Sequence, residues 1–173
     1  MSRPNASLIM MSVAALWLTA ATPLVSAQVQ WGSAKQGVRA GATPLSVRET
    51  AVDVVISLEG DVLFDFDRFD LRGEAEPLLQ KAIEVVRRYP GRRITLAGHT
   101  DAKGARPYNL TLSEQRAEAV KAWLVTHGVA AEQITTRGYC QSRPVAPNAN
   151  PDGSDNPTGR QKNRRVEIIV NKN

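Results

Sequence analysis

Residues 98–117, GHTDAKGARPYNLTLSEQRA, connect an apolar segment to an amphipathic one. The preceding segment 93–99, RITLAGH, is mostly apolar and predicts a central strand, whereas the residues after the loop predict a helix. Asp101 comes just after the strand, and Arg116 lies on the helix, fifteen residues later. A loop that folds the helix start back over the strand end brings this carboxylate and this guanidinium together. Such a pair suits a small ligand that carries both an ammonium and a carboxylate group.

The amphipathic helix is expected to begin at a cap near its first apolar residue. Either Asn109 caps it, or Thr111 and Glu114 form a capping box. Gly128 is a typical helix stop. The side chains predicted to face inward recur at helical spacing and are Leu110, Ser113, Ala117, Val120 and Leu124.

Further elements are expected on both sides of this region. A helix that begins at Asp70 and ends before Pro90 carries apolar residues on one face. Residues 144–159 are rich in proline and asparagine, as in a surface loop. The predicted strands are 52–58, 62–66, 93–99, 134–139 and 165–170. This βαβαββ order indicates an α/β sandwich of the α+β type, with two main helices packed against one mixed sheet. The side chains expected in its core include Phe64, Phe66 and Leu96.

Residues 1–27 have the three regions of a secretory signal peptide. Arg3 and the terminal amine are positive, residues 8–21 are apolar, and Val25-Ser26-Ala27 offers small side chains for cleavage. The apolar run is shorter than the roughly 20 residues that span a bilayer, and a retained membrane anchor is the alternative. No cysteine lies near the cleavage site, so no lipid anchor is expected. We therefore expect export to the periplasm, with association at the outer membrane or the cell wall.

After cleavage, residues 28–50 are expected to form a flexible leader and residues 51–173 one folded domain. The chain carries 22 Lys and Arg against 17 Asp and Glu, for a net charge of +5. These charges are interleaved along the sequence and do not cluster with aromatic residues, which argues against a nucleic-acid-binding protein. The excess positive charge favours solubility and weak attraction to anionic envelope polymers.

Cys140 is the only cysteine of the chain, so an intrachain disulfide is excluded. We expect a packed, structurally neutral thiol, and a bond to another chain is the alternative. The chain has only two histidines, so a three-ligand zinc site of the usual types lacks donors. No metal and no cofactor are expected, and His99 is interpreted as a hydrogen-bonded strand residue.

Four blocks follow one another along the chain: VLFDFD, GHTDAKGARPYNLTLSEQRAEAVKAWLVTHGV, ITTRGYCQSRPV and GRQKNRRVEIIV. In this order and spacing they resemble the OmpA-like C-terminal domain over about residues 52–171. That family includes the peptidoglycan-associated lipoprotein and the periplasmic domain of the flagellar stator protein. The resemblance implies non-covalent binding to peptidoglycan, chiefly through the diaminopimelate of its stem peptide, with a role in anchoring or stabilising the envelope.

The resemblance also implies the residues of the binding pocket. Asp101 matches the aspartate that contacts diaminopimelate, and Arg116 matches the arginine that pairs with its carboxylate. The other matched pocket positions are Thr100, Asn109, Leu110, Asp67, Arg164 and Arg165. Sequence alone does not decide which of the two adjacent arginines faces the ligand. Gly98 and Gly104 are interpreted as places where the chain bends closely around a bound group.

The same residues also have purely structural interpretations. Asp101 and Arg116 are consistent with an internal salt bridge, and Arg164 with its neighbour Arg165 is consistent with a solvated pair. The chain departs from the family pattern where Cys140 and Gln141 replace a glycine and an acidic residue. Any turn or salt bridge that the family makes there is therefore an open question.

Two other functions are alternatives. A cell-wall-modifying enzyme needs a nucleophile with a base, a metal, or two carboxylates across a cleft. Asp65 and Asp67 alternate onto the same face of the predicted strand, which does not indicate a cleft, and we expect no enzyme. An envelope adaptor that acts through a protein partner is compatible with wall binding, and residues 28–50 are the segment to test. The sequence does not determine the oligomeric state.

Overall fold

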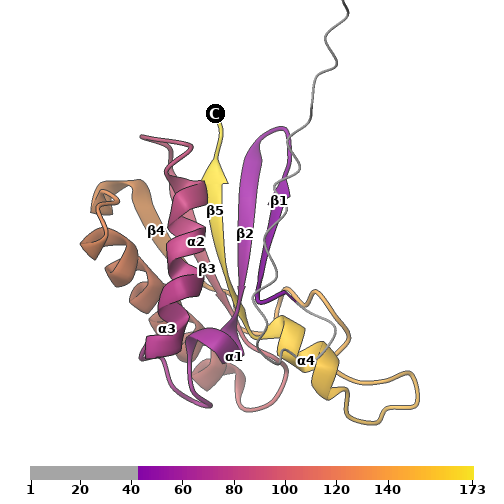
Figure 1. Cartoon of the computed structure of the whole chain (residues 1–173). Coiled ribbons are helices and arrows are strands. Elements are labelled where there is room, and N and C mark those ends of the chain that lie inside the picture. The colour runs from indigo at the N-terminus through magenta and orange to yellow at the C-terminus, as the bar shows by residue number, and fades with distance from the viewer. Residues whose placement is uncertain (1–42) are drawn as a thin grey trace, which may run out of the picture. The chain divides into compact units, whose positions relative to one another are not determined.

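The computed structural model describes residues 43–173, and five strands in this part form one mixed sheet in the order β1-β2-β5-β3-β4 (Figure 1). The strands are β1 (Leu45–Glu49), β2 (Asp53–Glu59), β3 (Ile94–His99), β4 (Ile134–Gly138) and β5 (Arg165–Asn171). β3 and β4 run parallel, whereas all other neighbours in the sheet are antiparallel. The C-terminal strand β5 therefore lies in the middle of the sheet, between β2 and β3.

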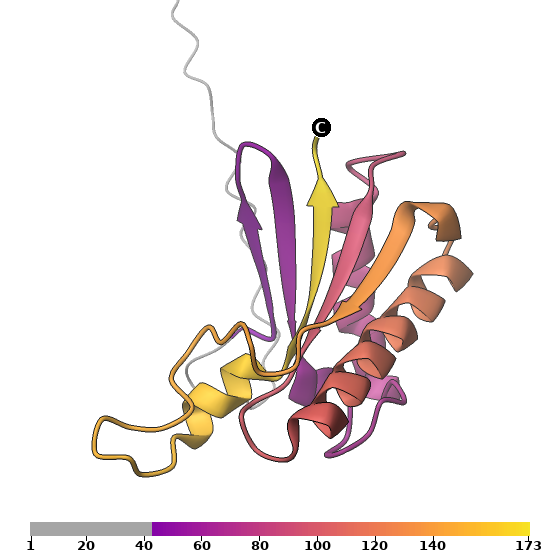
Figure 2. The same cartoon turned by 180° about the vertical axis from the view of Figure 1, so that it is seen from behind.

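Helices cover one face of the sheet. The helices and 3-10 turns are α1 (Gly60–Leu63), η1 (Gly73–Ala75), α2 (Glu76–Val86), α3 (Arg106–Thr126), η2 (Ala131–Gln133) and α4 (Pro157–Asn163). In Figure 1, α2 and α3 lie across the front of the sheet, while α1 and α4 lie near its lower end. Figure 2 shows the other face, which is open along most of the strands. The loop between β4 and α4 runs beside the lower end of this open face.

Apolar alternation in the strands produces these layers. Every second residue of the two central strands is at most 1% exposed, namely Val54, Ile56, Leu58, Val166, Ile168 and Val170. These residues pair directly across β2 and β5 and form one core with apolar side chains of α2 and α3. The predicted fold, two main helices packed on one mixed sheet, is confirmed.

The predicted strand at 62–66 is wrong. The chain leaves the sheet after Glu59, and the next four residues form the single helical turn α1. Phe64 then makes only an isolated bridge, outside the sheet. The alternation of apolar and acidic residues in this stretch therefore reflects a loop that crosses the end of the core.

The aromatic residues of this loop divide between core and solvent. Phe64 and Leu96 are 2% and 0% exposed, as predicted, but Phe66 is 94% exposed. Phe66 lies in a turn that is closed by a hydrogen bond from the Arg68 N–H to the Asp65 carbonyl, at 3.1 Å. In this turn the two-residue repeat of a strand no longer applies, so Phe66 does not follow Phe64 into the core.

Both long helices begin with a proline in the first turn and not at the predicted caps. α2 begins at Glu76, after η1, so Asp70 is not its cap. α3 begins at Arg106, earlier than predicted. Pro77 and Pro107 fit these positions because the first helical N–H groups have no partner within the helix.

The face of α3 that packs on the core differs from the prediction at one residue, and the predicted caps are wrong. Asn109 and Thr111 lie inside the helix and do not cap it. Leu110, predicted to face inward, is 41% exposed, whereas Leu112 is 7% exposed and takes the inward position. The remaining predicted inward residues are buried, namely Ser113, Ala117, Val120 and Leu124.

The sheet begins before the predicted domain start. β1 falls within residues 28–50, the predicted leader, and pairs antiparallel with β2. Four of its five side chains are exposed, so this edge strand lacks the buried alternation that would reveal it in the sequence. The predicted signal peptide and the leader up to residue 42 lie outside the described residues and stay predictions. Among the helices in residues 43–173, none is long and apolar enough to cross a membrane.

β3 and α3 approach each other most closely at Gly98. A Cβ at this position would lie 1.9 Å from the backbone carbonyl oxygen of Ser113. Packing of the strand against the helix therefore requires this glycine, and its interpretation as a bend around a bound group is wrong. Gly104 has φ +93°, a left-handed conformation that glycine adopts most easily. The close approach at Gly98 brings the end of β3 next to the first turns of α3.

Candidate ligand-binding site

A cavity of about 570 Å³ lies at the carboxyl end of β3. Its walls are the residues just after β3, the first turns of α3, the segment 61–72, and α4 with the residue that follows it. Six of the eight predicted site residues line this cavity, namely Asp67, Thr100, Asp101, Asn109, Arg116 and Arg164. The topology thus brings together groups from four separate parts of the chain.

Asp101 is buried, and the protein itself occupies both of its carboxylate oxygens. Oδ1 accepts the backbone N–H of Lys103 at 3.0 Å, and Oδ2 accepts a hydrogen bond from Arg164 Nη1 at 2.8 Å. A second guanidinium, that of Arg160, lies 3.5 Å from Oδ2. The alternative of a salt bridge between Asp101 and Arg116 is not realised in the described chain, where the acidic residue pairs with these other two arginines.

Arg164 bridges two carboxylates. Its Nε and Nη2 donate to Asp61 at 2.7 and 2.5 Å, and its Nη1 donates to Asp101. The planar guanidinium matches the two oxygens of a carboxylate, so the Asp61 pair has fixed geometry. The hydrogen bonds to Asp61 and Asp101 raise the pKa of Arg164, which keeps this side chain charged. Arg164 therefore ties the segment after β2 to the end of β3.

Arg160 extends this arrangement from the previous turn of α4. Its guanidinium donates to both oxygens of Asp155, at 2.8 and 2.6 Å. Lys103 Nζ lies 3.7 Å from the same carboxylate. We call the connected set the salt-bridge network, and it is neutral as a whole because it holds as many acidic as basic side chains. Its members are Asp61, Asp101, Asp155, Lys103, Arg160 and Arg164.

Arg116 is a buried cation outside this network. Its side chain is 6% exposed, its Nε donates to the carbonyl of Arg68 at 2.9 Å, and its guanidinium carbon lies 5.1 Å from the centre of the Phe64 ring. Within residues 43–173, no carboxylate oxygen lies within 4.0 Å of its nitrogens. Burial lowers the pKa of Arg116, but a guanidinium stays protonated in proteins. An anchored cation without a counter-ion favours binding of a carboxylate.

Asp67 lies at the rim of the cavity and is exposed. The hydroxyl of Tyr108, in the first turn of α3, donates to Asp67 Oδ1 at 2.7 Å. This hydrogen bond raises the pKa of Tyr108. The backbone of Asp67 is left-handed, with φ 60°, which is uncommon for a residue other than glycine. The turn and the tyrosine together fix the position of this carboxylate.

Two predicted site residues shape the loop between β3 and α3. Thr100 Oγ1 donates to the carbonyl of Asp101 at 3.0 Å, and Asn109 Nδ2 donates to the carbonyl of Lys103 at 2.7 Å. Both side chains therefore hold the loop that carries the buried aspartate. Leu110, in contrast, does not line the cavity, because it lies on the solvent side of α3 and is 41% exposed.

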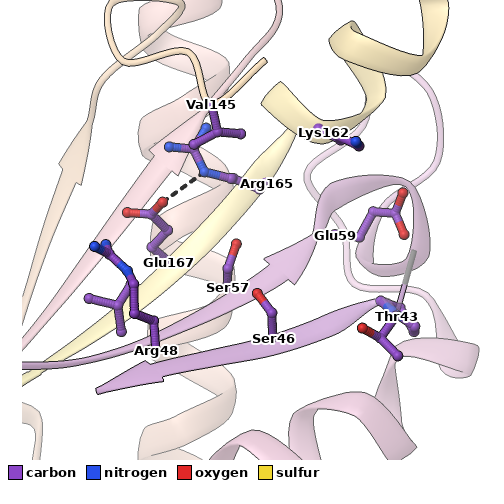
Figure 3. A pocket seen from close by; sticks show the side chains of 11 residues that line it. Thr43, Ser46, Arg48, Ser57, Glu59, Val145, Lys162, Arg165 and Glu167 are labelled. Atoms are coloured by element: carbon purple, nitrogen blue, oxygen red, sulfur yellow. Dashed lines mark hydrogen bonds and ion pairs between the residues drawn. The ribbon is translucent and has the colours of Figure 1, made fainter. Parts of the chain in front are cut away.

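The two adjacent arginines lie on opposite faces of the sheet. Arg164 faces the cavity, whereas Arg165 lies on the open face and lines a separate cavity of about 600 Å³ (Figure 3). Arg165 Nε donates to Glu167 at 2.7 Å, and its Nη2 donates to the carbonyl of Arg143 at 3.1 Å. The structure thus places Arg165 outside the predicted pocket, because successive residues entering a strand face opposite sides.

Among the lining residues that sequence reasoning missed, three take part in the polar contacts of the predicted site residues, namely Arg160, Asp61 and Tyr108. Arg160 and Arg164 are four residues apart across a helical segment, and this spacing places them side by side. That spacing was a usable signal. Asp61 lies two residues after the end of β2, and nothing in its local sequence indicates a partner 103 positions away. Tyr108 resembled an ordinary helix residue, since its role depends on the turn at Asp67.

Cys140 is a packed thiol, as predicted. It is 3% exposed, and its Sγ–H donates to Gln141 Oε1 at 3.0 Å. Its backbone has φ 53°, again in the left-handed region. The turn that a glycine would make here is therefore formed with a cysteine in its place.

His99 lies beside the site, on the open face of the sheet. It is 2% exposed, its ring stacks on that of Tyr139 with centroids 5.4 Å apart, and its Nε2 lies 3.7 Å from Glu167 Oε2. Neither ring nitrogen has a hydrogen-bond partner among the described residues. The interpretation of His99 as a hydrogen-bonded strand residue is therefore wrong. Burial lowers the pKa of His99.

Comparison with known proteins shows that the model of the OmpA family matches residues 63–158. The chain belongs to the OmpA family. This OmpA-family chain is 47% identical over 117 residues to a part of photosystem I P700 chlorophyll a apoprotein A2 from Gloeobacter violaceus, a match that covers 68% of this chain and 13% of that protein. It is 36% identical over 137 residues to the peptidoglycan-associated lipoprotein of Brucella melitensis, covering 78% of this chain and 75% of the lipoprotein.

Solved structures share the fold of this OmpA-family chain. The cell wall anchor of the T6SS from Pseudomonas aeruginosa superimposes with a TM-score of 0.64 at 30% identity, covering 74% of this chain and 87% of the anchor. The chain spans 13% to 37% of the length of several of its curated relatives, the Gloeobacter violaceus protein among them. The likeness to those proteins is therefore a likeness of one OmpA-family region.

Proposed function

We propose that this chain binds peptidoglycan non-covalently in the periplasm, through the diaminopimelate of the stem peptide, and so anchors or stabilises the cell envelope. The observation that carries the proposal is the buried guanidinium of Arg116, which lines the cavity without a carboxylate partner in the described chain. The names of two relatives, a peptidoglycan-associated lipoprotein and a cell wall anchor, support the ligand class.

The chemistry of diaminopimelate fits this cavity. The end of its side chain carries an ammonium and a carboxylate on the same carbon, so it requires a donor and an acceptor that are close to each other. Arg116 offers planar donors for the carboxylate. Each charge-assisted hydrogen bond contributes about 1.5–3 kcal/mol net, so a single stem peptide binds modestly. Repeated sites along the wall then supply retention through avidity when several copies are held together.

We infer a binding role without chemical change of the wall. In the cavity, the groups nearest the buried Asp101 already pair with one another, which suits recognition of a fixed charge pattern more than proton transfer. Incubation of the protein with labelled sacculi is expected to release no soluble muropeptides. Time-dependent release above that of a buffer control would show that the protein is an enzyme.

Arg116→Gln is expected to reduce co-sedimentation with purified sacculi by at least about tenfold, because one lost charge-assisted contact costs about 1.4 kcal/mol or more. Arg72→Gln is the matched control. Arg72 lines the same cavity, but it lies 3.6 Å from Asp65 and 3.5 Å from Glu74, so it already has acidic partners. The control should keep native co-sedimentation, and both variants should keep the native circular dichroism spectrum. Native-level sedimentation of a folded Arg116→Gln protein would contradict the proposed function.

A further inference from the structure

The outer edge of β1 is an unpaired sheet edge in the described part of the chain. β1 is the end strand of the sheet order, and its strand neighbour there is β2. At one end of their ladder, the Thr50 N–H donates to the Asp53 carbonyl at 2.8 Å. Because the backbone groups of a strand alternate in direction, the N–H and C=O groups that point away from β2 are those of Leu45, Val47 and Glu49. Residues 43–173 thus leave a row of donors and acceptors that an added strand can use.

The side chains of β1 give this edge two different faces. Ser46 and Arg48 lie on the open face of the sheet and line the cavity of about 600 Å³ (Figure 3). On the other face Leu45 packs against the core, and Val47, which strand alternation places on the same face, is 46% exposed. A strand added to this edge therefore meets a cation beside a polar cavity on one face and an exposed valine on the other.

Arg48 is an exposed cation without an acidic partner in residues 43–173, since no carboxylate oxygen there lies within 4.0 Å of its nitrogens. The next residue, Glu49, pairs with Lys172 at 2.6 Å. Glu167, which lines the same cavity, pairs with Arg165 at 2.7 Å. Edge strands often carry charges that prevent pairing with another chain. The unpaired charge of Arg48 opposes pairing with a basic strand but favours pairing with an acidic one.

We propose that the outer edge of β1 binds an extended segment of a partner protein as an additional strand, with an acidic side chain opposite Arg48 and an apolar side chain opposite Val47. This interaction is separate from wall binding, because no residue of β1 lines the ligand cavity. It gives the envelope adaptor, the alternative function that the sequence leaves open, a defined contact within residues 28–50. In strand addition, main-chain hydrogen bonds supply affinity and alternate side chains supply specificity.

Antiparallel addition determines which side chains meet. Val47 exchanges two backbone hydrogen bonds with the residue opposite it, so Arg48 falls in a non-hydrogen-bonded pair, where side chains lie closer together. An acidic side chain opposite Arg48 then lies on the open face, at the cavity. The residue opposite Val47 lies on the face that carries the helices.

A second copy of β1 is a less suitable occupant of this edge. Pairing of β1 with itself about Val47 places Ser46 opposite Arg48. The two copies of Arg48 then occupy diagonal positions about 7–8 Å apart on one face, where like charges repel. The charge of β1 therefore favours a different, acidic strand.

The test follows the amide signals of the isotope-labelled full-length protein by NMR during titration with two end-capped peptides. They are Ser-Thr-Glu-Val-Thr-Ile-Ser, the acidic peptide, and Ser-Thr-Lys-Val-Thr-Ile-Ser, the lysine peptide. In the antiparallel register the third peptide residue lies opposite Arg48 and the fourth opposite Val47. The acidic peptide should bind about threefold to tenfold more tightly, because an opposite-charge pair replaces a repulsive one. The largest shifts are expected at the outward amides of Leu45, Val47 and Glu49.

Three variants locate the contact. Arg48→Glu should reverse the preference, so that the lysine peptide binds more tightly. Lys162→Glu is the matched control and should keep the native preference, because Lys162 lines the same cavity from α4 and not from β1. Val47→Pro should abolish binding of both peptides with a native circular dichroism spectrum, because it removes an outward N–H and keeps the bonds to β2.

The proposal is overturned if the native protein binds neither peptide or both equally, or if Arg48→Glu keeps the native preference. Shifts of the same amides that depend on protein concentration without peptide would show that a second copy occupies the edge, which also overturns it. Arg48→Glu should keep native co-sedimentation with sacculi, so the outcome at β1 is independent of the proposed wall binding.

Discussion

Cys140 shows how a single residue departs from the family pattern without breaking the site. Its φ of 53° is a conformation that costs an L-residue on the order of 1 kcal/mol and costs glycine almost nothing. The turn is nevertheless held, because the Cys140 N–H donates to Ser113 Oγ at 3.2 Å and its carbonyl accepts the Thr100 N–H at 3.0 Å. These two bonds connect the turn to α3 and to the end of β3.

Two substitutions of Cys140 should separate the energetic cost of its left-handed backbone from the contribution of its buried thiol to packing. Cys140→Gly and Cys140→Ala both remove the sulfur, but only the alanine variant keeps a Cβ at positive φ. The glycine variant is therefore expected to be more stable than the alanine variant by about 1 kcal/mol. Urea denaturation of both proteins measures this difference in the free energy of unfolding. Equal stabilities would show that the left-handed turn is not maintained in solution.

At the scale of elements, the contact between β3 and α3 determines the geometry of the site. Asp101 follows the strand, Arg116 lies on the helix, and Gly98 sets how closely the two elements approach. A change at this contact therefore moves both sides of the cavity at once.

Gly98→Ala is expected to destabilise the protein by about 1–3 kcal/mol, because its Cβ would meet the Ser113 carbonyl oxygen at 1.9 Å and backbone has to shift. Binding to sacculi should fall as well, since the strand end moves away from the helix. Gly73→Ala is the control, because a Cβ there meets nothing within 4 Å. Urea denaturation and co-sedimentation test both variants. A Gly98→Ala protein with native stability would mean that the strand and the helix lie further apart.

Periodicity in the sequence was sufficient to predict the strands and helices that bury one apolar face. β2, β3, β5 and both long helices all have such a pattern, and all were predicted. β1 was not, because an exposed edge strand needs no apolar repeat. α4 was not, because its seven polar and small residues follow a long loop. The helix starts were displaced because proline in the first turn replaced the expected polar caps.

The sequence predicted which residues line the candidate site better than it predicted which of these residues form ion pairs with one another. Asp101, Arg116 and Arg164 do line one cavity. The partners of Asp101, however, depend on the direction in which α4 presents Arg160 and Arg164, and no local pattern encodes that direction. Leu110 and Phe66 were wrongly predicted to face the core. A shift of one position along a helix or a strand-like loop is enough to move a side chain from the core to solvent.

At the scale of the whole molecule, the open face of the sheet carries a buried set of ionisable groups. His99 is surrounded there by Glu167, Arg165, Arg143 and the ring of Tyr139. Burial lowers the pKa of His99, and Arg165 and Arg143 act in the same direction, against Glu167. His99 and Arg165 in turn hold the pKa of Glu167 at about 2.

These shifts predict lower stability in mild acid. Below about pH 6.5 the unfolded chain protonates His99 while the folded protein resists, so the free energy of unfolding falls by up to about 1.4 kcal/mol per pH unit. Glu167 adds a further loss only below about pH 4.5, where the unfolded chain begins to bind its proton. Urea denaturation at pH 7.5, 6.5 and 5.5 should show that His99→Gln flattens this slope. His127→Gln, the control at the end of α3, should keep it, and an unchanged slope in His99→Gln would contradict the assignment.

The central position of β5 has a consequence for how the chain acquires its structure. β5 is the last of the five described strands along the sequence, yet it lies between β2 and β3 and joins the two halves of the sheet. A nascent chain that ends before Arg165 therefore lacks the strand that connects its β1–β2 hairpin to the β3–β4 pair. Pairing between elements this far apart in sequence is slow compared with local helix formation. Assembly of the sheet, and of the cavity beside it, thus requires β5, and chain lengths that end before this strand lack the connected sheet.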